Sequence, residues 1–279
     1  MSKIAILLDS GCNIKEDIDK GIFVVPIYVN FNDISKRDLV DIDPKELYER
    51  IDEDVQTAAP GINDFMSKIE LIKEMGYEKI LGIAISLALS ATFNSMKLAL
   101  ESSDMEYKIL DSKGVSISSS VIALYGSELI SRGLELDEVY NKLEEKIKDV
   151  KFYAVIQDLK YLIRGGRISH VKGVIGSMLK VNPILSINED GKIYNYKSTR
   201  GRANALKFLT DLVKNDLKDK KDYYFSLAYA KDKSDIDEMR ENFSEEIKNA
   251  KVYIEEPITA ALGVHAGPTV YGVCYMEVD

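Results

Sequence analysis

The sequence predicts an α/β protein of two domains. Residues 1–150 are expected to form a three-layer α/β/α domain around a parallel sheet, and residues 151–279 a two-layer α+β domain with a mixed or antiparallel sheet. Three observations carry this prediction. Apolar and amphipathic runs alternate through the first half, a hairpin signal opens a different pattern in the second, and a hydrophobic content of 46% over 279 residues suffices for a sizeable core.

In the first half, short apolar runs predict strands and amphipathic runs predict helices. The expected strands are Ile4–Leu8, Phe23–Val29, Ile80–Ile85 and Tyr107–Leu110. The expected helices are Asn63–Met75, Thr92–Glu101, Ile117–Ser131 and Leu136–Lys148. Strands that alternate with helices in this way form parallel sheets covered on both faces.

In the second half, Asp190–Gly191 lies between two alternating segments that begin at Pro183, which indicates a hairpin with a tight turn. Periodicity predicts further strands and two helices. The strands are Phe152–Ile156, Tyr223–Tyr229, Lys251–Ile254 and Tyr271–Val278, and the helices are Arg202–Leu217 and Lys233–Phe243. We expect a ligand to bind in a cleft between the two domains, where ligand sites are common.

Charge and composition exclude several classes of protein. With 46 acidic and 37 basic residues, the chain has a net charge of -9, which disfavours nucleic acid as a partner. Cys12 and Cys274 lie at opposite ends of the sequence, so neither a disulfide framework nor a zinc site is indicated. The apolar run near the N-terminus is too short for a signal peptide, and no run approaches a membrane span. We therefore expect a cytoplasmic protein without stable membrane insertion.

Hydroxyl groups gather where two of the predicted helices begin. Thr57 precedes the helix near Asn63–Met75, and Ser90, Thr92 and Asn94 follow the third strand. A helix N-terminus offers unpaired N–H groups to an anion, although a hydroxyl there also serves as an ordinary cap. Five polar side chains within ten residues are more than one cap needs, and this favours an anion site; they are Ser86, Ser90, Thr92, Asn94 and Ser95.

His265 is one of only two histidines, and it lies in the stretch Gly263–Pro268 between two predicted strands. We expect a glycine- and proline-containing turn that lets the backbone approach a ligand closely, or else a turn that merely contains a histidine. Together with Thr57 and Ser90, His265 could supply the donors that a carboxylate needs.

Two basic clusters stand out in this acidic chain. Arg167 follows a glycine pair, and Arg200 and Arg202 flank Gly201. Arginine pairs strongly with carboxylates and phosphates, so contact with an anionic partner is one interpretation, and helix capping or a solvated turn is the other.

Motifs for most enzyme classes are absent from the sequence. It contains no P-loop, no GxGxxG, no GxSxG elbow and no metal-ligand spacing. No catalytic residue, metal or cofactor is therefore predicted.

The motifs taken together resemble the DegV family over essentially the whole chain. In order, they are Leu8–Asp9–Ser10–Gly–Cys12, Thr57–x–x–Pro60, Ser86–x–x–Leu–Ser90–Ala–Thr92–Phe–Asn94–Ser, Leu110–Asp111–Ser112, Tyr161–Leu–x–Arg–Gly–Gly–Arg167–Ile, Pro183–Ile–Leu and His265–Ala–Gly–Pro. The resemblance implies a two-domain protein that buries one long-chain fatty acid between its domains. It also implies a partner, the ATP-binding subunit of a fatty acid kinase, which converts the presented carboxylate to acyl phosphate for phospholipid synthesis.

Site residues follow from the resemblance. It implies that the fatty acid carboxylate binds Thr57 and Ser90 with His265 nearby, and that Thr92 and Asn94 belong to the same site. It further implies that the kinase subunit docks against Arg167, Arg200 and Arg202. The residues expected to line the acyl chain are Ile156, Leu162, Ile175, Met178, Leu179, Ile184 and Leu262.

The sequence departs from the family pattern beside the expected carboxylate site. Ala58, Ala59 and Ala91 stand where the family usually carries serine, glutamine and glycine, which alters the surroundings of the head group. The alternative hypothesis is an enzyme that acts on a small anionic substrate at Thr57, Ser90 and His265.

Overall fold

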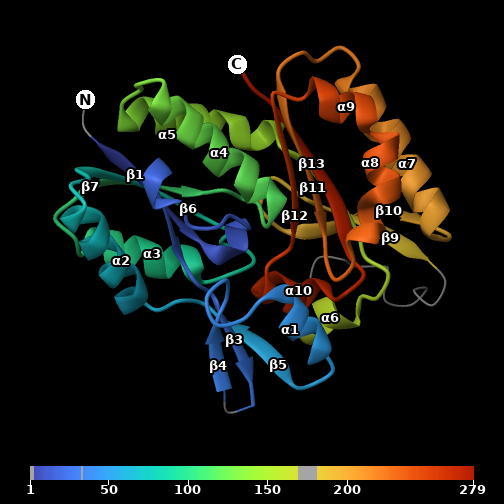
Figure 1. The fold of residues 1–279 in the computed structure, drawn as a ribbon, viewed down its shortest axis with the longest axis horizontal. Helices are drawn as coiled ribbons and strands as arrows, with labels where there is room; N and C mark the ends of the chain where they lie inside the picture. Colours follow the sequence, from blue (N-terminus) through green and yellow to red (C-terminus); the bar gives the residue numbers. More distant parts are fainter. Residues whose placement is uncertain (1–2, 33, 169–180) are drawn as a thin grey trace.

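A parallel sheet of four strands forms the centre of the first half of the chain. The computed structural model describes residues 3–32, 34–168 and 181–279. The strand order is β2-β1-β6-β7, and every neighbouring pair is parallel (Figure 1). The strands are β1 (Ile4–Asp9), β2 (Ile22–Val25), β6 (Lys79–Ala84) and β7 (Glu106–Asp111).

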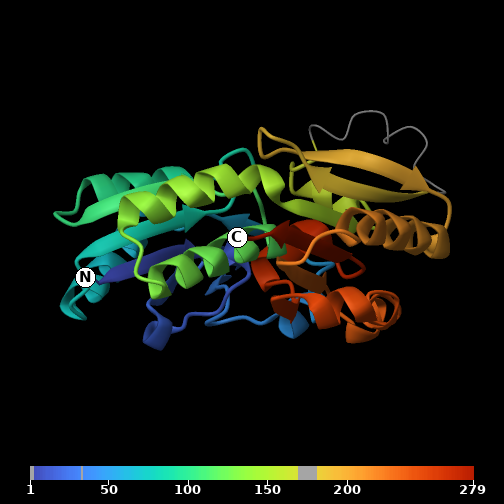
Figure 2. The same ribbon diagram turned by 90° about the horizontal axis from the view of Figure 1, so that it is seen from above.

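Helices cover both faces of this sheet, which confirms the predicted α/β/α layering. Alternate residues of β1 face opposite layers: Leu7 packs with α2 and α3, whereas Ile6 and Leu8 pack with α4 and α5. Figure 1 shows the sheet between these helix pairs, and Figure 2 shows the same layers from above. The helices are α2 (Ile62–Glu74), α3 (Thr92–Glu101), α4 (Ile117–Ser131) and α5 (Leu136–Lys146).

A small antiparallel sheet of three strands, in the order β4-β3-β5, extends from the parallel sheet. The single strand expected at Phe23–Val29 is therefore wrong. Pro26 separates β2 from β3, and because proline lacks an N–H it is a natural break between strands. The elements of this region are β3 (Tyr28–Phe31), β4 (Ile34–Arg37), α1 (Pro44–Glu49) and β5 (Val55–Ala58).

The second half contains a mixed sheet of six strands in the order β10-β9-β8-β13-β11-β12. Only the pair β11 and β12 is parallel, and the predicted hairpin forms β9 and β10. The strands are β8 (Lys151–Val155), β9 (Asn182–Ile187), β10 (Ile193–Thr199), β11 (Tyr223–Tyr229), β12 (Val252–Pro257) and β13 (Tyr271–Glu277).

The two faces of the mixed sheet have different neighbours. Tyr153 and Val155 of β8 pack in a core with α7 and α8, whereas Ala154 belongs to the core shared with α4. The helix expected at Lys233–Phe243 is divided into a 3-10 turn at Lys233–Ile236 and α8. The covering helices are α7 (Arg202–Leu217), α8 (Asp237–Asn242) and α9 (Ser244–Asn249).

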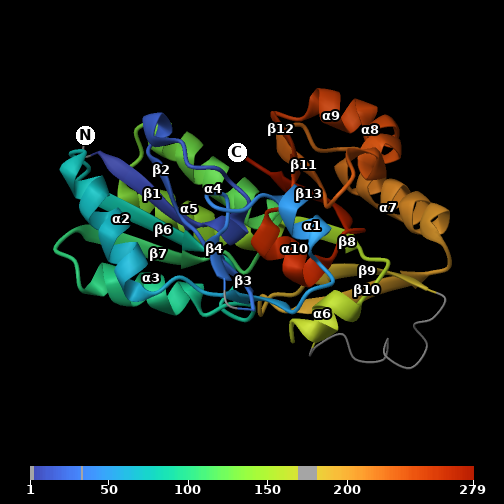
Figure 3. The same cartoon turned by 60° about the horizontal axis from the view of Figure 1, so that its bottom comes forward.

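Helix α10 (Ala260–Ala266) corrects the expected turn around His265. Thr259 is its extended N-cap residue, and Gly267 ends it with a φ of 77°. Although it lies near the end of the chain, α10 contacts α1, β3 and β5 from the first half and α6 (Lys160–Arg164) from the second (Figure 3). His265 is therefore carried by a helix at the meeting point of the two halves.

Asp9 at the end of β1 has a structural role, as its position before a 3-10 turn (Ser10–Cys12) suggests. Its carboxylate accepts hydrogen bonds from the N–H groups of Gly11, at 2.8 Å, and Ile85, at 3.0 Å. Burial raises the pKa of Asp9 to about 7, because desolvation disfavours its charged form. Asp9 thus ties the ends of two adjacent strands together while ionising only near neutral pH.

Replacement of Asp9 with asparagine should remove part of the pH dependence of stability. A pKa raised in the folded state contributes stability that is complete below the unfolded pKa and is lost as the pH rises through about 7. The wild-type protein should therefore lose stability relative to Asp9→Asn between about pH 4 and pH 7. Urea unfolding at each pH measures this, and Asp41→Asn is the control, since the pKa of Asp41 is lowered to about 2. A constant difference between wild type and Asp9→Asn would contradict the prediction.

Candidate functional site

A cavity of about 230 Å³ lies between the two large sheets, closed on one side by α10. Its walls are mostly apolar and come from segments far apart in the sequence. The lining residues are Ile27, Thr57, Ala59, Leu89, Ser90, Ala91, Val115, Ser116, Ile117, Phe152, Ala154, Ile156, Leu162, Arg167, Leu185, Ile193, Ala228, Ile258, Ala261, Leu262, His265, Ala266, Val270 and Gly272.

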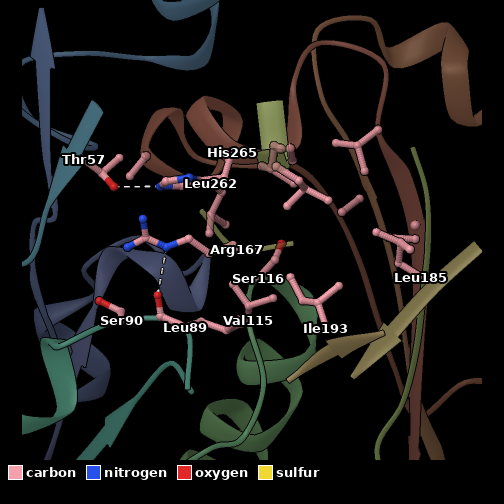
Figure 4. A pocket seen from close by; sticks show the side chains of 18 of the residues that line it. Thr57, Leu89, Ser90, Val115, Ser116, Arg167, Leu185, Ile193, Leu262 and His265 are labelled. Atoms are coloured by element: carbon pink, nitrogen blue, oxygen red, sulfur yellow. Dashed lines mark hydrogen bonds between the residues drawn. The ribbon is translucent and has the colours of Figure 1, made fainter. Parts of the chain in front are cut away.

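Thr57 and His265 meet at the polar end of the cavity (Figure 4). They lie 208 residues apart in the sequence, yet Thr57 Oγ1 is 2.7 Å from His265 Nε2. The pKa of His265 is lowered to about 4, first by burial and then by the positive charges of Arg167 and Arg164. The imidazole is therefore neutral at physiological pH and adds no charge to the site.

The surroundings of His265 indicate which ring nitrogen carries the proton. Nδ1 is buried and has no hydrogen-bond partner among the described residues, and it faces Gly165, where a Cβ atom would lie only 2.0 Å away. A buried N–H without a partner is rarer than an unpaired acceptor, so we assign the proton to Nε2. His265 then donates to Thr57, whose hydroxyl hydrogen is left for a ligand.

Arg167, which was expected to contact a partner protein, lines the cavity and provides its positive charge. Its Nε donates to the carbonyl of Leu89 at 3.2 Å, and its Nη1 to the carbonyl of Gly165 at 2.5 Å. Guanidinium has five N–H donors, so these two bonds leave three for a ligand. In Figure 4 the guanidinium lies between His265 and Ser90. The turn after α6 places it in the cavity, which the sequence did not indicate.

Ser90 lines the cavity as predicted from the resemblance, but Thr92 and Asn94 do not. Thr92 is buried behind Ser90, with 2.7 Å between their hydroxyl oxygens, and its N–H donates to Ser90 Oγ. Thr92 therefore orients Ser90. Asn94 is exposed on α3, because helical rotation turns it away from the cavity.

Three of the predicted acyl-lining residues, Ile156, Leu162 and Leu262, lie on the cavity wall. Ile184 does not, because side chains alternate along a strand: Leu185 faces the cavity, and Ile184 packs under α7 in the opposite core. The predicted residues Ile175, Met178 and Leu179 lie outside the described residues.

The second basic cluster lies outside the cavity. Arg200 is exposed, and the guanidinium of Arg202 lies 4.9 Å from the ring centroid of Tyr271. Sequence reasoning missed several lining residues, notably Ser116 and Ile193. Alternation along the hairpin indicates that Leu185 and Ile193 share one face but not that this face borders the cavity, and no local signal marks Ser116 as a lining residue.

The described residues contain no group of three or more His, Cys, Asp or Glu side chains able to hold a metal ion. The arrangement instead combines an apolar cavity with hydroxyls and one guanidinium at its end. Such a site suits an amphipathic anion, since arginine and hydroxyl donors bind a carboxylate and apolar walls bind a hydrocarbon chain.

Comparison with known proteins identifies the family. The DegV family model matches residues 3–278. The chain belongs to the DegV family. A DegV domain-containing protein of Clostridium acetobutylicum is 33% identical over 278 residues, with 98% of each chain covered. One from Clostridium perfringens is 30% identical, also with 98% of each chain covered.

Solved structures of DegV proteins share the fold. The DegV protein of Bacillus subtilis, described as a fatty acid binding protein, is 26% identical with a TM-score of 0.91, and 100% of each chain is covered. A DegV lipid binding protein of Thermotoga maritima is 26% identical with a TM-score of 0.85, and 99% of each chain is covered. In the part of this chain that the structure describes, no helix is long and apolar enough to cross a membrane.

Proposed function

We propose that this DegV protein binds one long-chain fatty acid in the cavity and presents the carboxylate to the ATP-binding subunit of a fatty acid kinase, which forms acyl phosphate. The observation that carries the binding proposal is an apolar cavity that ends in Thr57, Ser90, Arg167 and His265. The fatty acid would lie between domains 1–150 and 151–279. The fatty acid binding described for the Bacillus subtilis protein supports this assignment.

The hydrocarbon chain would provide most of the binding free energy. Burial of roughly 14 methylene groups at about 0.8 kcal/mol each yields on the order of 11 kcal/mol of gross transfer free energy. Cavity walls such as Ile156, Leu185 and Leu262 are apolar, so little of this energy is lost to unpaired polar groups. The hydrocarbon chain thus determines the affinity, and the carboxylate determines the position of the fatty acid in the cavity.

The polar end of the cavity would hold the carboxylate in its ionised form. Burial of an unpaired carboxylate is unfavourable, but hydrogen bonds from Thr57 and Ser90 and the charge of Arg167 offset this and favour ionisation. A neutral His265 orients Thr57 without taking the role of the counterion. An ionised carboxylate is the form that can attack the terminal phosphorus of a nucleotide.

The transfer of phosphate would depend on the partner. The chain lacks the glycine-lysine motif of a P-loop, so the kinase subunit would supply nucleotide, magnesium and charge stabilisation, while this protein supplies position. Arg200, exposed on the turn before α7, and Arg202 beside it are our proposed docking contacts. The purified chain alone is expected to form no acyl phosphate from ATP.

Native mass spectrometry of the purified protein tests the binding proposal. A bound mass equal to that of a long-chain fatty acid is expected, released only on denaturation. A small bound anion, or turnover of one, would instead favour an enzyme acting at Thr57, Ser90 and His265. An empty protein that takes up no added hexadecanoic acid would overturn the proposal.

Removal of both hydroxyls, in Thr57→Val with Ser90→Ala, should separate binding from presentation. We expect kinase-coupled acyl phosphate formation to fall by about 100-fold, because small misplacement of a reacting group has effects of that size. Retention of fatty acid should fall by less than about tenfold, since the tail dominates affinity. The assay combines the variant, ATP, magnesium and a fatty acid kinase subunit. Ser95→Ala, which removes a hydroxyl on α3 outside the cavity lining, is the control. An equal reduction in acyl phosphate formation and in fatty acid retention would contradict the prediction.

A further inference from the structure

Ser116, between β7 and α4, has an unusual backbone conformation. Its φ is 57° and its ψ is -134°, a combination that residues other than glycine rarely adopt. A glycine would occupy this position without strain. Because the Ser116 side chain is retained despite this strain, we expect it to have a function.

The hydroxyl of Ser116 does not cap the helix that follows it. Ser116 is the N-cap residue of α4, yet its side chain makes no capping hydrogen bond. The N–H groups of Ser119 and Ser120 donate instead to the carbonyl oxygen of Ser116, each at 3.0 Å. The helix start is thus satisfied by backbone groups alone.

The hydroxyls of the neighbouring serines in the same turn all have hydrogen-bond partners within the protein. Ser118 donates to the carbonyl of Val115 at 2.7 Å, Ser119 pairs with Ser112 at 2.8 Å, and Ser120 donates to the carbonyl of Cys12 at 2.6 Å. Ser116 is only 7% exposed, and its Oγ has no partner among the residues that the structure describes. A buried, unpaired hydroxyl is unfavourable unless a ligand satisfies it.

Ser116 lines the cavity at the boundary between its polar and apolar parts. In the view of Figure 4, its hydroxyl lies between Arg167 on the polar side and Ile193 and Leu185 on the apolar side. The carboxylate already has donors in Thr57, Ser90 and Arg167, which match the lone pairs that it offers. Ser116 therefore faces the part of the ligand that follows the head group.

We propose that Ser116 is a specificity-determining residue whose hydroxyl donates a hydrogen bond to an oxygen on the acyl chain close to its carboxyl end. The preferred ligands are then long-chain acids oxygenated near the head group, of which 3-hydroxy acids are the simplest, rather than unsubstituted acids of equal length. This inference rests on the proposed function, since it assumes an acyl chain in the cavity. An unsubstituted chain would leave the Ser116 hydroxyl unpaired.

Competition between two acids tests the assignment. Delipidated protein is loaded with equal amounts of hexadecanoic acid and 3-hydroxyhexadecanoic acid, and native mass spectrometry measures the bound ratio. We expect the wild-type protein to favour the hydroxy acid by about five- to tenfold, as one buried hydrogen bond provides. Ser116→Ala should reduce this preference to within about twofold by weakening the hydroxy acid only.

Two further variants keep the test decisive. Ser118→Ala, two residues further along the same turn and outside the cavity lining, should retain the wild-type preference. Ser116→Gly removes the hydroxyl together with the backbone strain, so it should lose the preference while its Tm rises. Ser116→Gly therefore tests the role of the hydroxyl even if Ser116→Ala folds poorly.

The contrary outcomes are distinct. Equal binding of both acids by the wild-type protein would overturn the assignment of Ser116. Equal weakening of both acids by Ser116→Ala would also overturn it, because the hydroxyl would then bind the carboxylate. If folded wild-type protein binds neither acid, the proposed function itself fails.

Discussion

Replacement of Arg167 with methionine should raise the pKa of a bound fatty acid carboxylate by about 1–3 units, the usual effect of a neighbouring arginine. Arg167 is the cationic side chain that lines the cavity, and its bonds to the carbonyls of Leu89 and Gly165 hold it there. Methionine keeps the length of the side chain and removes the charge. Carboxyl-labelled hexadecanoic acid, titrated in the bound state by ¹³C NMR, measures the change.

The same variant should slow acyl phosphate formation near neutral pH, because a larger fraction of the carboxylate is protonated and cannot attack phosphorus. Arg200→Met is the control: Arg200 is exposed and does not line the cavity, so the carboxylate should titrate as in wild type. Identical titration curves for wild type and Arg167→Met would show that the carboxylate lies elsewhere.

Ile193→Trp should reduce fatty acid binding by about 5- to 150-fold, because extra side-chain volume in an occupied space costs about 1–3 kcal/mol. Ile193 is half-buried on β10 at the edge of the mixed sheet and lines the apolar part of the cavity. The indole would occupy the space that we assign to the acyl chain. Native mass spectrometry after loading with hexadecanoic acid measures the bound fraction.

Ile187→Trp provides a matched control. Ile187 is the cross-strand partner of Ile193, so it lies on the same face of the hairpin, yet it does not line the cavity. The control should bind fatty acid within about threefold of wild type, since its added volume lies outside the cavity. Similar loss in both variants would indicate distortion of the hairpin rather than a blocked cavity.

Local sequence patterns were sufficient to predict most of the helices and strands. Helices Thr92–Glu101, Ile117–Ser131 and Arg202–Leu217 and strand Tyr223–Tyr229 form where periodicity predicts them. Helix and strand periods are properties of neighbouring residues, so the sequence carries them directly. The small sheet was missed because β4 is exposed and without apolar alternation, and β5 is too short to show a period.

The helix at Ala260–Ala266 shows how a local signal can mislead. Gly263 and Gly267–Pro268 suggested a turn around His265, yet the run of alanine and leucine before it favours a helix that only Gly267 ends. Gly263 is needed inside this helix for packing, since a Cβ atom there would lie 2.6 Å from Leu47. That contact belongs to the tertiary structure and leaves no trace in the local pattern.

The sequence by itself determined the layered α/β architecture and placed Thr57 before one predicted helix and Ser90 after the third predicted strand, because both depend on short-range periodicity and on the residue types next to helices and strands. Only the tertiary structure decided that Arg167 enters the cavity, that Leu185 rather than Ile184 faces it, and that His265 meets Thr57 across 208 residues. These outcomes depend on strand register and on long-range packing. A shift of one residue in register exchanges the two faces of a strand, and no neighbouring residue in the sequence records which face the fold will bury against the cavity.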